Sequence, residues 1–222
     1  MILSDREIQI ALDRGMLRIS PAVSPERYSS TAIDLTLDAP LQRWENPLSH
    51  RVQLLLDPTD KEFNVTRLAQ DHATTISCEQ GAEIQPGSLM LGWTIEKVQL
   101  PRESRLAARV EGKSSLARIG IGVHITAPTI HAGFGFRAGE PSFEGNSIQL
   151  EIWNFGPFNV RLTKAMPICQ LIFEEVHGTP LRGYEGQFRV QGPDVTSPLR
   201  HRTIPKRRSA RRTGGSAPDL LS

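Results

Sequence analysis

The sequence predicts a mainly β fold, a closed or double-sheet arrangement of short strands with one short helix at the N-terminus. Past Gly15, apolar residues alternate with polar ones in short runs and do not recur at every third or fourth position. Turn-forming pairs such as Pro86-Gly87 separate the runs. Such alternation places every second side chain on one face, as strands that cover a core require.

The helix is expected at about residues 4–14. Ser4 is followed three residues later by Glu7, which is a capping-box pattern. Ile8, Ala11 and Leu12 then recur at helical spacing until Gly15 ends the run. The expected strands follow in order at 33–37, 52–56, 89–95, 107–111, 122–126, 148–153, 160–162 and 168–173.

Length and charge predict one domain over residues 1–199 and a basic disordered tail over 200–222. The chain has 222 residues, of which 38% are hydrophobic, enough for one compact core. Seven basic residues and one acid lie in 200–222, which leaves 19 basic and 23 acidic residues before it. The tail has little apolar periodicity, and a solvated tail is favoured over contact with nucleic acid.

Two cysteines, Cys78 and Cys169, are too few for a disulfide framework or a four-cysteine zinc site. No apolar run approaches the roughly 20 residues that span a bilayer. We therefore expect a cytoplasmic protein with no membrane partner.

The segment richest in candidate binding residues runs from residue 109 to residue 127. Gly112 ends a strand-like run, and Ser114 and Ser115 follow between Lys113 and Arg118. Hydroxyl groups, backbone amides and two cations form a suitable cradle for phosphate, and residues 114–118 resemble a short helical turn. The alternative is a surface turn with incidental charges.

Several segments resemble the dCTP deaminase family, a relative of the trimeric dUTPases. They are EGKSSLAR at 111–118, VHITA at 123–127, QPGSLMLGWTIE at 85–96, IQLEIWN at 148–154 and MPICQL at 166–171, with further likeness at 4–8 and 28–37. The resemblance covers roughly residues 1–195. It implies a dUTPase-like distorted β-barrel of the double-sheet, jelly-roll type, assembled as a homotrimer with active sites between subunits.

The implied reaction is hydrolytic deamination of dCTP to dUTP and ammonia, without zinc and with Mg²⁺ bound through the nucleotide triphosphate. Glu151 would be the catalytic carboxylate that moves protons at cytosine C4. Ser114 and the Ala127 backbone would orient the attacking water, and Arg118 would hold Glu151 and the nucleotide in register. Each has a structural alternative: an outward-facing strand glutamate, a turn cap, a packing residue and a surface ion pair.

The resemblance also implies nucleotide contacts and a closing segment over the triphosphate at residues 184–193. The implied nucleotide-binding residues are Lys113, Ser115, His131, Gln149, Tyr184, Gln187 and Gln191.

The chain departs from the family at three of these positions and in one insertion. His131 replaces an aspartate that meets the deoxyribose and, in dUTPases, orients the water that attacks the α-phosphate. Gln187 replaces a lysine, and Lys113 replaces an arginine with its bidentate fork. Residues 133–146 lengthen a hairpin, which would alter the pocket wall, extend the trimer surface or meet a new partner.

Two rival functions stay open at this point. One is a dUTPase or a bifunctional deaminase and pyrophosphatase, against which His131 argues, because an imidazole is a weaker anionic orienter than a carboxylate. The other is a nucleotide-binding regulatory paralogue that has lost activity, against which Glu151, Ser114 and Arg118 argue.

Overall fold

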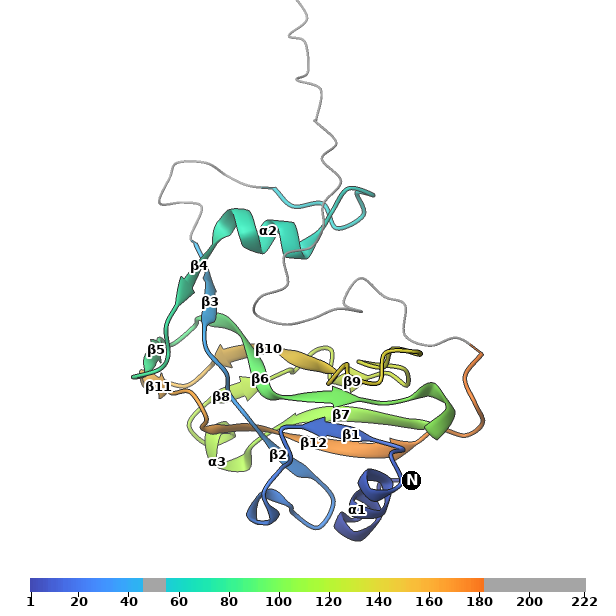
Figure 1. The fold of residues 1–222 in the computed structure, drawn as a ribbon. Coiled ribbons are helices and arrows are strands. Elements are labelled where there is room, and N and C mark those ends of the chain that lie inside the picture. Colours follow the sequence, from blue (N-terminus) through green and yellow to red (C-terminus); the bar gives the residue numbers. More distant parts are fainter. Residues whose placement is uncertain (46–54, 182–222) are drawn as a thin grey trace, which may run out of the picture.

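The computed structural model describes residues 1–45 and 55–181 (Figure 1). The predicted tail at 200–222 and the segment 184–193, with Tyr184, Gln187 and Gln191, lie outside the described residues. The helices in the described ranges are α1 (Asp5–Asp13), α2 (Val65–His72), α3 (Ser114–Ala117) and the 3-10 turns η1 (Pro25–Arg27) and η3 (Arg102–Ser104). None of them is long and apolar enough to cross a membrane.

The largest sheet has six strands, all antiparallel to their neighbours. Its order is β4-β3-β6-β10-β8, and β1 also pairs with β6. Glu151, in the middle of β10, lies opposite Leu91 of β6. The strands are β1 (Arg18–Ser20), β3 (Leu41–Trp44), β4 (Ala73–Ile76), β6 (Leu89–Gln99), β8 (Ile121–Val123) and β10 (Asn146–Asn154).

A second sheet has four strands in the order β2-β12-β7-β9, and β5 and β11 form a two-stranded pair. In Figure 1 the two larger sheets are stacked, with α1 below them and α2 at the end of a projecting β3–β4 arm. The strands are β2 (Ile33–Thr36), β12 (Pro167–Glu175), β7 (Leu106–Gly112), β9 (Thr129–Ile130), β5 (Ala82–Ile84) and β11 (Val160–Leu162).

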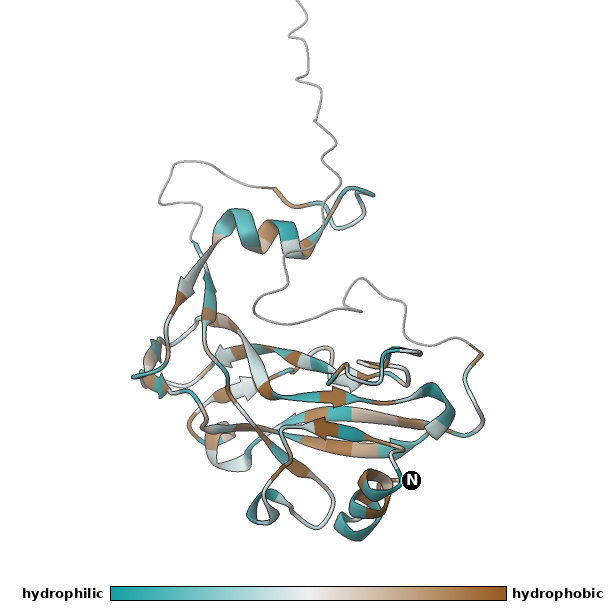
Figure 2. Ribbon diagram, viewed as in Figure 1, coloured by the Kyte–Doolittle hydropathy of each residue, from teal (hydrophilic) through white to brown (hydrophobic). Residues whose placement is uncertain are grey.

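The core lies between the sheets and receives alternate side chains from both. Leu150 and Ile152 of β10 and Leu171 and Phe173 of β12 are fully buried in one hydrophobic cluster. Figure 2 shows hydrophobic colours along the strands of both sheets. The predicted double-sheet fold is confirmed, although the strand order of the described ranges leaves both sheets open and forms no closed barrel.

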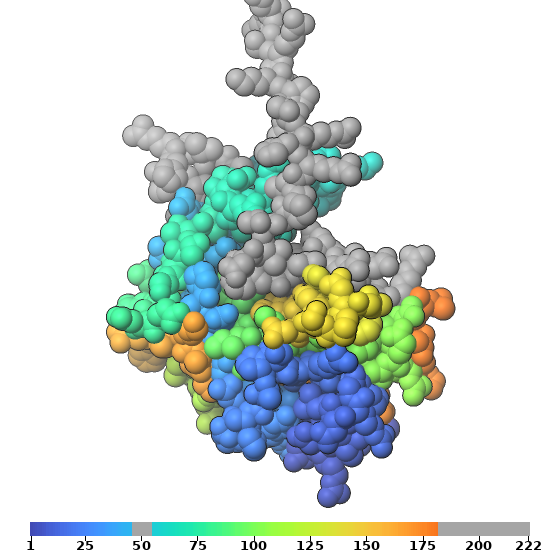
Figure 3. Space-filling model, viewed as in Figure 1, coloured from blue at the N-terminus to red at the C-terminus, as the bar shows by residue number. Residues whose placement is uncertain are grey.

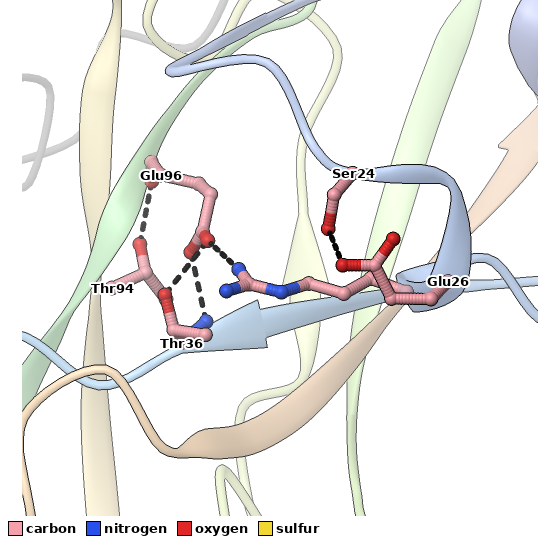
Figure 4. A network of polar contacts seen from close by, with 6 residues as sticks. Ser24, Glu26, Thr36, Thr94 and Glu96 are labelled. Carbon is pink, nitrogen blue, oxygen red and sulfur yellow. Dashed lines mark hydrogen bonds and ion pairs between the residues drawn. The ribbon is translucent and has the colours of Figure 1, made fainter.

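A buried carboxylate joins the two sheets. Glu96 of β6 is 2% exposed and accepts hydrogen bonds from the Thr36 backbone N–H at 2.8 Å and the Thr36 hydroxyl at 2.7 Å, both on β2. Arg27 of η1 donates to it at 2.9 Å (Figure 4). Because a buried charge needs such partners, this network fixes β2 relative to β6.

The predicted helix and most predicted strands are confirmed. Ser4 caps α1, accepting from the Glu7 N–H, and the Glu7 carboxylate accepts from the Ser4 N–H at 2.8 Å. The predicted strand at 52–56 is wrong at residues 55 and 56, which form no strand, and its remainder lies outside the described residues. The predicted strand at 122–126 ends early, at Val123, because His124 adopts φ +56°.

The insertion at 133–146 forms turns over 133–145 and no hairpin of its own, and Asn146 already begins β10. The Gly133 N–H donates to the Leu100 carbonyl at 2.6 Å, and the Leu100 N–H donates to the Phe134 carbonyl at 2.8 Å. Lys97 pairs with Glu144 at 2.7 Å. The insertion therefore packs against the end of β6, and Figure 3 shows this yellow segment lying against the blue N-terminal residues.

Candidate active site

Glu151 lies on the half-buried face of β10, where its side chain is 39% exposed. Leu150 and Ile152 on either side point into the core, so strand alternation alone explains why Glu151 faces outward from it. Gln149 lies two residues earlier on the same half-buried face. Strand β8 pairs with β10 beside this face, and Val123 is opposite Ile152. The carboxylate is thus placed at the point where β8 ends.

His124 is the first residue beyond β8, and its ring meets Glu151. Its backbone N–H donates to the Glu151 carbonyl at 3.0 Å, which continues the ladder by one residue. Its ring Nδ1 is 3.6 Å from Oε2 of Glu151, and the side chain is only 8% exposed. Burial lowers the pKa of His124, although the Glu151 carboxylate and a hydrogen bond with the Ala127 backbone act to raise it. One cluster therefore contains Glu151, His124 and the Ala127 backbone.

The predicted helical turn is α3, which presents its polar side chains to solvent. Ser114, Ser115 and Arg118 are all exposed. The Arg118 guanidinium forms no hydrogen bond or ion pair with residues 1–45 or 55–181. In the described part of one chain, therefore, no hydrogen bond or ion pair joins Glu151 to Ser114 or Arg118.

Lys113 is held by the sheet before α3 begins. Its Nζ pairs with the Asp34 carboxylate of β2, and both side chains are about four-fifths buried. Gln170 of β12 donates to the other Asp34 oxygen at 3.1 Å. This network fixes the start of α3 relative to the four-stranded sheet, and the phosphate contact predicted for Lys113 stays a prediction.

The remaining predicted residues in the described ranges lie on the connection between β8 and the insertion. Ala127 is exposed, and its backbone meets the His124 ring. His131 directly follows β9 and is exposed, and its carbonyl accepts from the Phe134 N–H at 3.0 Å.

Two residues of this region were not among the predicted site residues. His124 is part of the segment 123–127 that carried the family resemblance, and a histidine in a predicted strand beside a catalytic segment was an available signal. Asp34 gave no comparable signal, because its partners Lys113 and Gln170 are distant in sequence.

The shifted pKa of His124 predicts a pH-dependent stability. In the unfolded chain this histidine takes up its proton near pH 6.5, whereas the folded protein binds it only at lower pH. The unfolded state therefore gains protons first as the pH falls, and the free energy of unfolding decreases below about pH 6.5. Urea unfolding at pH 7.5 and pH 5.5 measures this decrease, which should be smaller in His124→Asn. Equal decreases in both proteins would contradict this assignment.

Comparison with known proteins first gives the fold. The crystal structure of 2′-deoxycytidine 5′-triphosphate deaminase from Agrobacterium tumefaciens matches 79% of this chain with a TM-score of 0.55 at 19% identity. This chain spans 48% of the length of that protein.

Comparison of sequences then gives the family. The model of the dCTP deaminase-like family matches residues 2–176. A dCTP deaminase, dUMP-forming, from Methanosphaera stadtmanae is 34% identical over 85% of this chain and 86% of its own. One of the same name from Kocuria rhizophila is 32% identical over 92% of this chain and 99% of its own. The chain belongs to the dCTP deaminase-like family.

Proposed function

We propose that this protein deaminates dCTP and releases dUMP. In the balanced reaction, dCTP and two waters give dUMP, ammonia and pyrophosphate. The observation that carries the proposal is the position of Glu151, a half-buried carboxylate beside the His124 ring in a chain of this family. We propose that the deamination uses side chains and water, as the family resemblance implies.

Glu151 moves the protons of the deamination. Its carboxylate takes a proton from the water that adds to C4 and delivers it to N3 of the ring. The tetrahedral carbon then loses the amine, which leaves as ammonia after Glu151 has transferred a second proton to it from the new hydroxyl. The Ala127 carbonyl and the Ser114 hydroxyl orient the water, and Arg118 contributes positive charge beside Glu151 and the nucleotide.

The names of the relatives change the product that we propose. The sequence favoured dUTP, because His131 stands where an aspartate orients water at the α-phosphate. The relatives from M. stadtmanae and K. rhizophila are both called dUMP-forming, which favours the bifunctional alternative. We therefore propose that a second water cleaves the bond between the α- and β-phosphates, with His131 orienting that water.

The substrate would bind as its Mg²⁺ complex, with the ion held by triphosphate oxygens. Ser115, Lys113 and the first amides of α3 would donate to the phosphates. Gln149, Tyr184, Gln187 and Gln191 complete the proposed nucleotide contacts.

A homotrimer with shared sites accounts for the lack of a hydrogen bond or ion pair between Glu151 and Arg118 in the described part of one chain. In such an assembly α3 of one subunit would face β10 of the next. Phe155 and Phe158, just after β10, are 66% and 62% exposed, and Ile125 is 52% exposed. Trp153 stacks on Phe155 with ring centroids 5.6 Å apart. Apolar surface of this kind beside an incomplete site supports subunit contact there.

The activity is tested by incubating the purified full chain with dCTP, CTP, dCMP and dUTP in separate reactions containing Mg²⁺. Ammonia, pyrophosphate and the nucleotide product are each quantified. We expect ammonia and pyrophosphate in equal amounts from dCTP. Nucleotide binding without turnover of any of the four would overturn the proposal and favour a regulatory protein.

Replacing His131 tests the proposed origin of the second step. His131→Asp should raise the rate of pyrophosphate release about tenfold, because a carboxylate orients and deprotonates water more effectively than an imidazole. His131→Asn is the matched control and should lower it. The ammonia rate, which depends on Glu151, should change less than the pyrophosphate rate in both variants. Pyrophosphate release that is the same in all three proteins would place this step elsewhere.

A further inference from the structure

His124 combines two unfavourable features, one in its ring and one in its backbone. Its Nδ1 is buried and has no hydrogen-bond partner in the described part of the chain. Its backbone has φ +56°, a left-handed conformation that is uncommon for residues other than glycine. Backbone strain of this kind lowers the stability of the fold, and a buried polar atom without a partner lowers it further. Together they place a polar ring beside Glu151.

The surroundings of the ring indicate which nitrogen carries the proton. The Ala127 backbone acts to raise the pKa of the ring, and Nδ1 has no hydrogen-bond partner in the described part of the chain, so we assign the ring proton to Nε2. In this assignment Nε2–H faces the Ala127 carbonyl. A neutral imidazole has only one N–H, so Nδ1 presents a lone pair toward Oε2 of Glu151, 3.6 Å away.

A lone pair facing a carboxylate is suited to one protonation state of that carboxylate. An ionised Glu151 has no proton to donate to Nδ1, whereas a protonated Glu151 carboxyl can donate to it. The protonated carboxyl exists during the deamination, after Glu151 has taken the proton from the attacking water. A short movement of the carboxyl toward Nδ1 would then complete the hydrogen bond.

We propose that His124 is a positioning residue for the deamination: its Nδ1 accepts a hydrogen bond from protonated Glu151, while its Nε2–H holds the Ala127 carbonyl. One ring thereby aligns the group that carries the proton and the group that orients the water. Glu151 is the charged group that acts on His124, and the interaction with Ala127 is with its backbone. This inference rests on the proposed deamination.

Two substitutions distinguish the effect of the ring on the reaction from the effect of the strained backbone. Asparagine tolerates positive φ and places its amide oxygen near the position of Nδ1, so His124→Asn keeps the acceptor. Glycine adopts positive φ most easily and has no acceptor, so His124→Gly removes the ring and relieves the strain. We expect the kcat of His124→Gly with dCTP to fall about 100-fold with a KM within about threefold of the original. His124→Asn should recover at least about tenfold of that loss.

The control is His72→Asn, at the exposed C-terminal end of α2, which should leave kcat and KM unchanged. A His124→Gly variant with undiminished kcat would overturn the inference, as would a His124→Asn variant no faster than His124→Gly. In both cases deamination by the original protein would leave the proposed function standing.

A measurement that needs no turnover covers the case in which dCTP is not deaminated. Nitrogen NMR of ¹⁵N-histidine-labelled protein at pH 7 should show the His124 ring neutral, with Nε2 protonated and Nδ1 bare. The Nδ1 resonance should shift in Glu151→Gln, because the amide N–H can donate to it. A ring protonated at Nδ1 would overturn the inference independently of activity.

Discussion

Glu151→Gln should reduce ammonia release from dCTP by about 1,000-fold or more. A positioned acid or base contributes about 10²–10⁴-fold to a rate, and in the proposed mechanism this carboxylate transfers two protons in each turnover. The amide has nearly the same shape but cannot accept a proton from water. Because Glu151 is 39% exposed and lies outside the core, the variant should fold normally and still bind dCTP.

The assay compares initial rates of ammonia release, with nucleotide affinity measured by calorimetry. Glu83→Gln is the matched control, since Glu83 lies on β5 and its side chain is 57% exposed. It should have the activity of the original protein. An active Glu151→Gln enzyme with unchanged kcat would remove the proposed acid and base from the mechanism.

Arg118→Ala should lower kcat/KM for dCTP by about 100-fold or more, because it removes an exposed guanidinium that we place beside the nucleotide and Glu151 of an adjoining subunit. The placement is tested by mixing. When Arg118→Ala and Glu151→Gln chains are unfolded together and refolded in equal amounts, random assortment gives about one quarter of the shared sites both intact residues.

The mixed preparation should therefore regain about one quarter of the original activity, although each variant alone is nearly inactive. The control is each variant refolded alone by the same procedure. If Glu151 and Arg118 of the same chain formed the site, mixing would restore nothing. Absence of recovery in mixed trimers would thus contradict the shared site while leaving the role of Glu151 intact.

Much of the fold follows from local patterns in the sequence. The capping box of Ser4 and Glu7 defines the start of α1, and the alternation in 148–153 defines β10, because these signals depend on neighbours in the chain. The short strands β3 and β4 and the helix α2 were not predicted. They form an arm whose pairing depends on contacts between residues about 30 positions apart, such as Leu41 with Ile76. Periodicity within a short window does not report such contacts.

The functional site was predicted only in part, because it also depends on contacts that a short stretch of sequence does not reveal. Family resemblance identified Glu151 and the 123–127 segment, and in the structure Glu151 and the Ala127 backbone each act on the His124 ring. No hydrogen bond or ion pair joins Ser114 or Arg118 to Glu151 within the described chain. The ring of His124 was missed because its role depends on the left-handed turn that ends β8, and nothing in the residues 121–127 alone predicts that turn. The nucleotide contacts predicted at Tyr184, Gln187 and Gln191 stay predictions.

Water labelled with ¹⁸O gives the most direct test of the central claim that this site adds water to cytosine C4. Wild-type protein is incubated with Mg²⁺ and dCTP in the labelled water, and the nucleotide product is analysed by fragment mass spectrometry. We predict dUMP with one labelled oxygen on the uracil base, formed together with an equal amount of ammonia. Recovery of a cytosine nucleotide with label only in its phosphate, or with no label, would contradict the account.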